Sequence, residues 1–171
     1  MKIPSFQSGV EILTALTVVT AALYDYKRRL IPNFITFPAI FTGLFIHWIH
    51  AGTSGFYFSL RGVTIGGGVF LILYIIGGIG GGDVKLLGSV GALVGGEKIL
   101  IIIILTVLIG GIMAIGKLAF SSNRLNRLRY FIDLFQKNQA AIYENNIDPL
   151  KDTIPYGVAI AAGTLMALTL Y

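Results

Sequence analysis

The sequence contains no cysteine and little charge. Its 171 residues include no Cys and only 2 His, and 12% of them are charged whereas 55% are hydrophobic. Without cysteine the chain forms no disulfide, offers no thiolate ligand for zinc and has no cysteine nucleophile. A soluble domain of this length carries far more charge on its surface, so a water-soluble globular protein is excluded. Chemistry must come from acids, lysines, hydroxyls or the two histidines.

What the sequence has instead is a series of long apolar runs. Several reach the roughly 18 to 20 residues that cross a bilayer, so we expect an all-α polytopic membrane protein. Six transmembrane segments are predicted, with ends defined to roughly 2 to 4 residues, at about 9–28, 34–51, 56–79, 84–95, 98–119 and 154–171. No repeat of fixed period occurs, and we expect residues 1–171 to form a single membrane-embedded domain.

The basic residues predict how these segments are oriented. Lys2 alone precedes the first run and three cations follow it at 27–29, the reverse of a cleaved signal peptide. With the N-terminus outside, 10 of the 13 Lys and Arg residues fall on the cytoplasmic side, all but Lys2, Arg61 and Lys98. The positive-inside rule therefore favours this orientation in the inner or plasma membrane. The net charge of +5 then requires no nucleic-acid partner.

One long polar stretch runs from Ser121 to Asp152. Apolar residues recur there at helical spacing among basic ones, namely Leu125, Leu128, Ile132 and Phe135 with Arg124, Arg127, Arg129 and Lys137. This pattern predicts a cytoplasmic amphipathic helix between the fifth and sixth segments, lying on an anionic leaflet. A surface that docks substrate is the alternative, and the sequence does not separate the two.

Two aspartates stand at the ends of apolar segments. Asp25 lies in the last turns of the first segment, and Asp83 follows the third in GIGGGDVKLLG, residues 78–88. Since the first and third segments run in the same direction, both acids reach the cytoplasmic end. At ~1.5 Å per residue Asp25 lies about 21 Å beyond Glu11, in the inner boundary zone of the bilayer.

Two carboxylates at a membrane boundary predict a catalytic site, because each carboxylate there costs free energy unless it is hydrated, paired or protonated. Like charges a few ångströms apart share one proton and titrate as a unit. The ionised member can take a proton from water while its partner donates one to a carbonyl oxygen, as in aspartic proteases. Such hydrolysis needs no metal, so we expect no cofactor. Structural roles are the alternative: Asp25 could neutralise Lys27 or Arg28, and Asp83 could cap the fourth segment.

Glycine occurs 22 times and often at a spacing of four. Most such pairs, for example Gly62 with Gly66, predict close approach of helix backbones. We expect a different use for Gly80, Gly81 and Gly82, because a backbone without Cβ atoms can adopt unusual dihedrals and lie against an extended substrate.

Three elements, taken in chain order, resemble the type IV prepilin peptidases, which are membrane-embedded aspartic proteases of the GxGD class. Asp25 is followed by basic residues and IPN at 31–33; the G-x-G-D ending at Asp83 continues as VKLLG; and IPYG occupies 154–157. The resemblance implies that Asp25 and Asp83 are the catalytic pair. It also implies that the enzyme clips the leader of a prepilin at the cytoplasmic face.

Residues near these motifs are candidates for binding substrate. Pro155, Tyr156 and Gly157 begin the last segment on the side of the acids, where they could line the site. Lys85 obeys the positive-inside rule, and it would favour the ionised form of an acid if it pointed at the pair. Pro32 suits the first turn of the second segment better than substrate contact.

The larger bifunctional members of that family carry an N-methyltransferase region and a cysteine-based zinc motif, and this sequence has neither. It therefore resembles the short forms that serve Flp-type (Tad) pili, from which we expect cleavage without methylation, or alternatively the archaeal preflagellin peptidases. The substrate is then a prepilin or preflagellin-like protein. The sequence does not determine the oligomeric state.

Two other classes of membrane protein also place acids in their membrane segments. The presenilin and signal-peptide-peptidase group also uses GxGD, and Tyr24 with Asp25 echoes its first motif, but its acids lie on neighbouring antiparallel helices near mid-membrane. A small transporter whose acids bind protons or cations is the non-enzymatic alternative. His47 and His50, beside Trp48 toward the outer end, are predicted to be interfacial residues.

Overall fold

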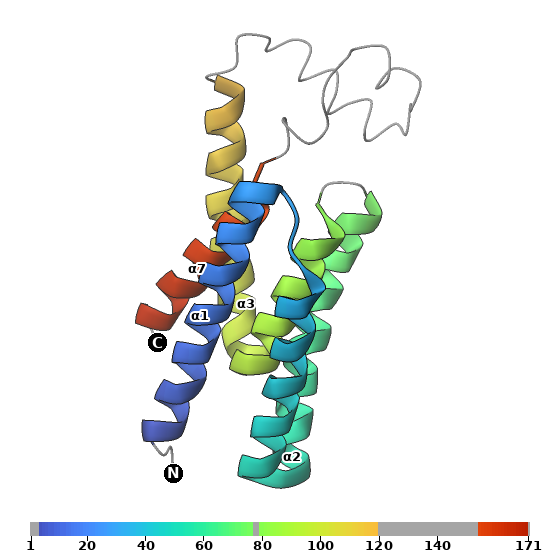
Figure 1. Ribbon diagram of the computed structural model, residues 1–171, viewed down its shortest axis with the longest axis vertical. Coiled ribbons are helices and arrows are strands. Elements are labelled where there is room, and N and C mark those ends of the chain that lie inside the picture. The colour runs from blue at the N-terminus through green and yellow to red at the C-terminus, as the bar shows by residue number, and fades with distance from the viewer. Residues whose placement is uncertain (1–3, 77–78, 120–153, 171) are drawn as a thin grey trace.

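The computed structural model describes residues 4–76, 79–119 and 154–170. Within these ranges the chain is helical and contains no strand: α1 (Pro4–Arg28), α2 (Asn33–Ile76), α3 (Gly81–Ala119) and α7 (Tyr156–Leu170) (Figure 1). The all-α class is confirmed. The amphipathic helix predicted between Ser121 and Asp152 lies outside the described residues.

Helix α2 is a helical hairpin. Its 44 residues would extend about 66 Å if straight, roughly twice the thickness of a bilayer core. Ala51 and Gly52 interrupt it, and Gly52 has a φ of 60°, a conformation that glycine adopts without steric cost. Figure 1 shows the chain reversing there at the end of the bundle where the N-terminus lies. Gly55 keeps the bend tight, because a Cβ at this position would overlap the carbonyl oxygen of His47.

Helix α3 also reverses, at Gly95. This residue has a φ of 82°, and the ring of Phe58 occupies the space that a Cβ would take. The first arm of α3, residues 81–94, is about 21 Å long, so it ends short of the roughly 30 Å of a bilayer core. The second arm runs back toward Ala119 (Figure 1).

The two interruptions fall where consecutive predicted segments meet, between the second and third and between the fourth and fifth. Three helices are long and apolar enough to cross a membrane, namely Phe6–Arg28, Asn33–Ile76 and Gly81–Lys117, and Tyr156–Leu170 is a shorter apolar helix. The expectation of membrane-spanning helices is thereby supported. Six crossings and an outside N-terminus stay predictions.

The first arm of α3 packs between both arms of α2, and these two helices share the largest interface of the described chain. Glycines make the approach possible. A Cβ at Gly43 would lie 2.7 Å from the backbone of Ala92, and one at Gly62 would overlap the carbonyl oxygen of Gly91. Gly66 is similarly close to Leu87, so the packing role predicted for Gly62 and Gly66 is confirmed.

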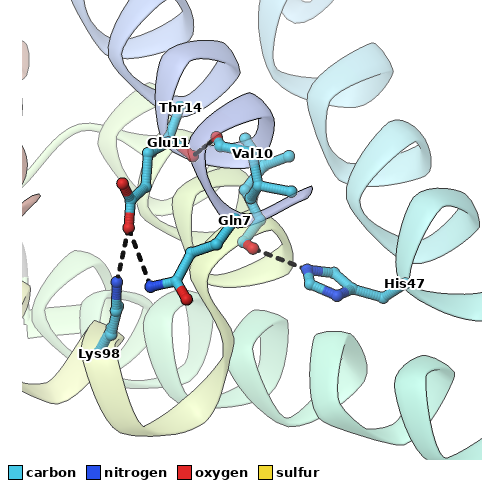
Figure 2. A network of polar contacts seen from close by, with 7 residues as sticks. Gln7, Val10, Glu11, Thr14, His47 and Lys98 are labelled. Atoms are coloured by element: carbon cyan, nitrogen blue, oxygen red, sulfur yellow. Dashed lines mark hydrogen bonds and ion pairs between the residues drawn. The ribbon is translucent and has the colours of Figure 1, made fainter. Parts of the chain in front are cut away.

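A polar network joins α1, α2 and α3 at the end of the bundle opposite Asp25 and Asp83 (Figure 2). Lys98 Nζ donates to Glu11 Oε1 at 2.9 Å, and Gln7 Nε2 donates to the same oxygen at 3.2 Å. His47 Nε2 lies 2.8 Å from the carbonyl oxygen of Leu93. A cavity of about 330 Å³ lies beside this network.

The interfacial role predicted for the two histidines is wrong for His47. It is buried, and its ring bonds the end of the first arm of α3 just before the Gly95 reversal. A buried carbonyl at a helix end needs a partner, and the imidazole supplies one. His50 is exposed, and its ring stacks on Phe6 with centroids 3.8 Å apart.

Candidate active site

Asp25 lies in the last turn of α1 and is buried, 7% exposed, although Tyr26, Lys27 and Arg28 after it are exposed. The backbone N–H of Gly157, at the start of α7, donates to Asp25 Oδ2 at 2.8 Å. A Cβ on Gly157 would lie 2.9 Å from that oxygen, so the contact requires glycine. The hydrogen bond therefore joins two helices that are 132 residues apart in sequence.

The end of α1 is defined by Arg29. Its φ of 53° is left-handed, a conformation that commonly terminates helices, although glycine or asparagine usually adopts it. The N–H of Arg29 donates to the carbonyl oxygen of Asp25 at 2.8 Å. The Arg29 guanidinium also interacts electrostatically with the Asp25 carboxylate. This positive charge beside Asp25 is a feature of the site that sequence reasoning did not assign to Arg29 in particular.

Asp83 is in the first turn of α3 and is 8% exposed. Its Oδ2 accepts from the N–H of Gly80 at 3.2 Å, while its own N–H donates to the Gly80 carbonyl oxygen at 3.1 Å. The side-chain bond is the half of a capping box in which the third residue of the helix binds the N–H of the capping residue; Gly80 has no side chain to form the other half. A negative charge is also favourable at this end of a helix. The capping role considered for Asp83 is therefore present in the structure.

Asp25 and Asp83 come together from α1 and α3 at the same end of the bundle (Figure 1). They are close enough that the charge of Asp25 acts on Asp83. Within the described chain each carboxyl group uses one oxygen, Oδ2, in a backbone hydrogen bond. The other oxygen of each carboxyl group, Oδ1, has no hydrogen bond there and is not fully buried. It is therefore accessible to water or a ligand. Two nearby carboxyl groups with accessible oxygens can share a proton and act on one water molecule.

The structural alternative for Asp25 was neutralisation of Lys27 or Arg28. Both cations are exposed, and in the ranges that the structure describes neither forms an ion pair with Asp25. Its carboxylate accepts a hydrogen bond from the backbone of Gly157, and the cation that acts on it is Arg29.

None of the three glycines before Asp83 has a positive φ; among the described glycines that conformation occurs at Gly52 and Gly95. The unusual backbone expected at Gly80, Gly81 and Gly82 is therefore wrong for φ, whereas their contact with an extended substrate stays a prediction. Their small size matters instead. A Cβ on Gly82 would lie 3.1 Å from the Cβ of Ile31, and one on Gly81 would lie 3.5 Å from the ring of Tyr74.

Lys85 points toward α2. Its Nζ donates to Asn33 Oδ1 at 3.0 Å and lies 5.6 Å from the centroid of the Phe37 ring. These are its interactions within the described residues, and neither involves an acid. Lys85 thereby contacts the first residue of α2. The helix begins at Asn33, so Pro32, which was predicted to lie in its first turn, immediately precedes it.

The IPYG motif reaches both acids. Helix α7 begins at Tyr156, directly after Pro155, whose carbonyl oxygen accepts from the N–H of Val158 at 3.1 Å. Gly157 bonds Asp25, and Tyr156 interacts electrostatically with Asp83. The structure thus brings Tyr156 and Gly157 to the acids, whereas it turns Lys85 away from them. Phe70, whose ring meets that of Tyr156 edge-on, was not foreseen by sequence reasoning.

Among the described residues no group of three His, Asp or Glu side chains could hold a metal ion. Among the described residues, the groups that act on the two carboxyl groups are the Tyr156 phenol, the Arg29 guanidinium and the backbone amides of Gly80 and Gly157.

Comparisons with known proteins agree with this arrangement. The sequence pattern of the type IV leader peptidase family matches residues 12–115, more than half of the chain, which includes Asp25 and Asp83. The chain is also 27% identical over 124 residues to a prepilin leader peptidase/N-methyltransferase of Aeromonas hydrophila; the match covers 66% of this chain and 41% of that relative. No solved structure matches. The chain belongs to the type IV leader peptidase family.

Proposed function

We propose that the chain is a prepilin leader peptidase, an aspartic endopeptidase in which Asp25 and Asp83 are the catalytic pair. The observation that carries this proposal is that two buried carboxyl groups from different helices lie close enough to interact electrostatically. Each also keeps one oxygen accessible. Membership of the type IV leader peptidase family supports the reaction. The name of the Aeromonas hydrophila relative supports a prepilin as substrate.

The proposed reaction is hydrolysis by a shared-proton dyad. One aspartate is ionised and accepts a proton from water as the water oxygen bonds the scissile carbonyl carbon; the other, protonated, donates its proton to the carbonyl oxygen. In the second step the first aspartate passes its proton to the amide nitrogen, the C–N bond breaks, and the second recovers a proton from the diol. The enzyme returns to its starting protonation state.

Backbone amides hold both carboxyl groups in position for these proton transfers. The Gly157 amide holds one oxygen of Asp25 and the Gly80 amide holds one oxygen of Asp83, so both side chains are fixed before substrate arrives. Such preorganisation is what makes hydrogen-bonded catalytic groups effective. Pro155, Tyr156 and Gly157 would line the substrate site beside them. Gly81 and Gly82 would keep the start of α3 close to Ile31 and Tyr74, so that the peptide can approach Asp83.

We further propose that the site faces the cytoplasm of the cell membrane, because 10 of the 13 basic residues fall on that side when the N-terminus is outside. We assign the substrate to the Flp-like prepilins and expect no N-methylation. The expectation about methylation rests on the absence of any cysteine for a zinc motif in this sequence.

The test is coexpression with an Flp-type prepilin in cells that lack other leader peptidases. We expect the wild-type protein to remove the leader, and both Asp25→Asn and Asp83→Asn to abolish removal, since each deletes one proton donor or acceptor of the pair. Mass spectrometry of the mature N-terminus would show an unmethylated amine. Accumulation of each variant in the membrane is measured in parallel.

The control variant is Glu11→Gln, which changes an acid at the opposite end of the bundle. It should cleave like the wild type. Cleavage by either aspartate variant would overturn the dyad, and failure of the wild-type protein to cleave would overturn the peptidase assignment. A methylated product would overturn only the expectation about methylation.

A further inference from the structure

Tyr156 is held by contacts with three helices at the end of the bundle where Asp25 lies. It is the first residue of α7, and the next residue, Gly157, is anchored to Asp25. Its ring meets Phe70 of α2 edge-on, with centroids 6.1 Å apart. Its hydroxyl end lies against α3 at Gly110, where a Cβ would be 2.6 Å from the phenol oxygen. Contacts with α2, α3 and the α1–α7 hydrogen bond therefore restrict the position of the phenol.

The Tyr156 hydroxyl has no protein partner in the ranges that the structure describes, although the residue is half-buried. In those ranges Thr106 Oγ1 is the fully buried side-chain polar atom that lacks a hydrogen-bond partner. The Tyr156 oxygen also lacks one but is not fully buried, so it remains accessible. A tyrosine hydroxyl that is partly buried usually finds a hydrogen-bond partner. Here a rigidly held donor, one residue from the hydrogen bond between Gly157 and Asp25, is left for a group that arrives from outside the chain.

We propose that the Tyr156 hydroxyl donates a hydrogen bond to the carbonyl oxygen of the scissile peptide and stabilises the negative charge that develops there as water adds. This inference rests on the proposed function of Asp25 and Asp83. Tyr156 transfers no proton; the dyad carries out the proton steps. The substrate class that it serves is any extended peptide whose carbonyl lies between Asp83 and the first turn of α7.

A donor of this kind acts mainly in the transition state, because the carbonyl oxygen bears most charge there. Its removal should therefore lower kcat and leave KM nearly unchanged. If Tyr156 only packs against Phe70, loss of its hydroxyl would leave kcat unchanged. If its hydroxyl only binds the peptide in the ground state, loss of the hydroxyl would raise KM instead.

The experiment is steady-state cleavage of a purified prepilin by the full-length enzyme in detergent. Tyr156→Phe keeps the ring and its contact with Phe70, and it should lower kcat about 10²-fold, the usual effect of losing one such donor. Tyr57→Phe, which removes an exposed hydroxyl near the bend of α2 at the opposite end of the bundle, is the matched control and should keep the wild-type kcat and KM. An unchanged kcat for Tyr156→Phe, or a change confined to KM, would overturn the proposal.

A second variant covers the case in which Tyr156→Phe does not fold. Gly110→Ala keeps the phenol but pushes its oxygen, and it should also lower kcat, whereas Gly111→Ala, which meets nothing within 4 Å, should not. Equal activity of the Gly110 and Gly111 variants would contradict the proposal. Asp25→Asn and Asp83→Asn are assayed alongside: cleavage by those variants refutes the dyad itself, while their inactivity together with a fully active Tyr156→Phe refutes only the role of the phenol.

Discussion

Gly157 is the residue through which α7 contacts Asp25, and its lack of a side chain can be tested directly. Gly157→Ala would place a Cβ 2.9 Å from Asp25 Oδ2 and 3.0 Å from Asp25 Cβ. Because a displacement of about 1 Å in a catalytic group can cost ~10²-fold in rate, we expect Gly157→Ala to lower the cleavage rate about 10-fold or more. Gly116→Ala, with open space around it, should cleave normally. Retention of full activity by Gly157→Ala would show that the contact does not position Asp25.

Thr106 and Thr164 form a natural pair for measuring what a buried hydroxyl contributes. Both are fully buried, yet Thr164 Oγ1 donates to the carbonyl oxygen of Ile160 at 2.7 Å whereas Thr106 Oγ1 has no partner in the described chain. Thr164→Val should lower the free energy of unfolding by about 0.5 to 1.5 kcal/mol. Thr106→Val should leave it unchanged or raise it, since it removes an unsatisfied group of similar shape. Thermal unfolding in detergent measures both, and an equal loss in the two variants would contradict the assignment.

Helices α2 and α3 depend on glycine where their backbones touch. Gly62→Ala would drive a Cβ into the carbonyl oxygen of Gly91, and overpacking of this kind typically costs about 1 to 3 kcal/mol. Gly68→Ala lies on the same arm of α2 but meets nothing within 4 Å, so it should stabilise the helix by roughly 0.5 to 1 kcal/mol. Opposite signs of the two changes in unfolding temperature are expected. Two equal changes would indicate that Gly62 is not at a tight helix contact.

The sequence predicted the helical class, the reversals of α2 and α3 and the joint position of Asp25 and Asp83, because hydropathy and helix direction depend on local runs of residues. Features that depend on how the helices pack escaped it. His47 was assigned by its neighbour Trp48, whereas its bond to Leu93 depends on how α3 packs on α2. The dihedrals of the glycines before Asp83 are set by the start of α3. The Gly157 bond to Asp25 spans 132 residues, a separation at which single-sequence patterns carry no contact information.

The whole molecule has one property that makes its orientation measurable: it contains no cysteine, so a single introduced thiol is the sole target of a maleimide. Thr53, at the bend of α2, and Lys27, at the end of α1, are both exposed and lie at opposite ends of the bundle (Figure 1). With the N-terminus outside, a membrane-impermeant maleimide should label Thr53→Cys in intact cells and Lys27→Cys only after permeabilisation. The cysteine-free protein provides the blank. Labelling of Lys27→Cys in intact cells would place the aspartates on the outer face of the membrane. Most basic residues would then lie outside, against the positive-inside rule. This result would refute a cytoplasmic site but would not bear on the pairing of Asp25 with Asp83.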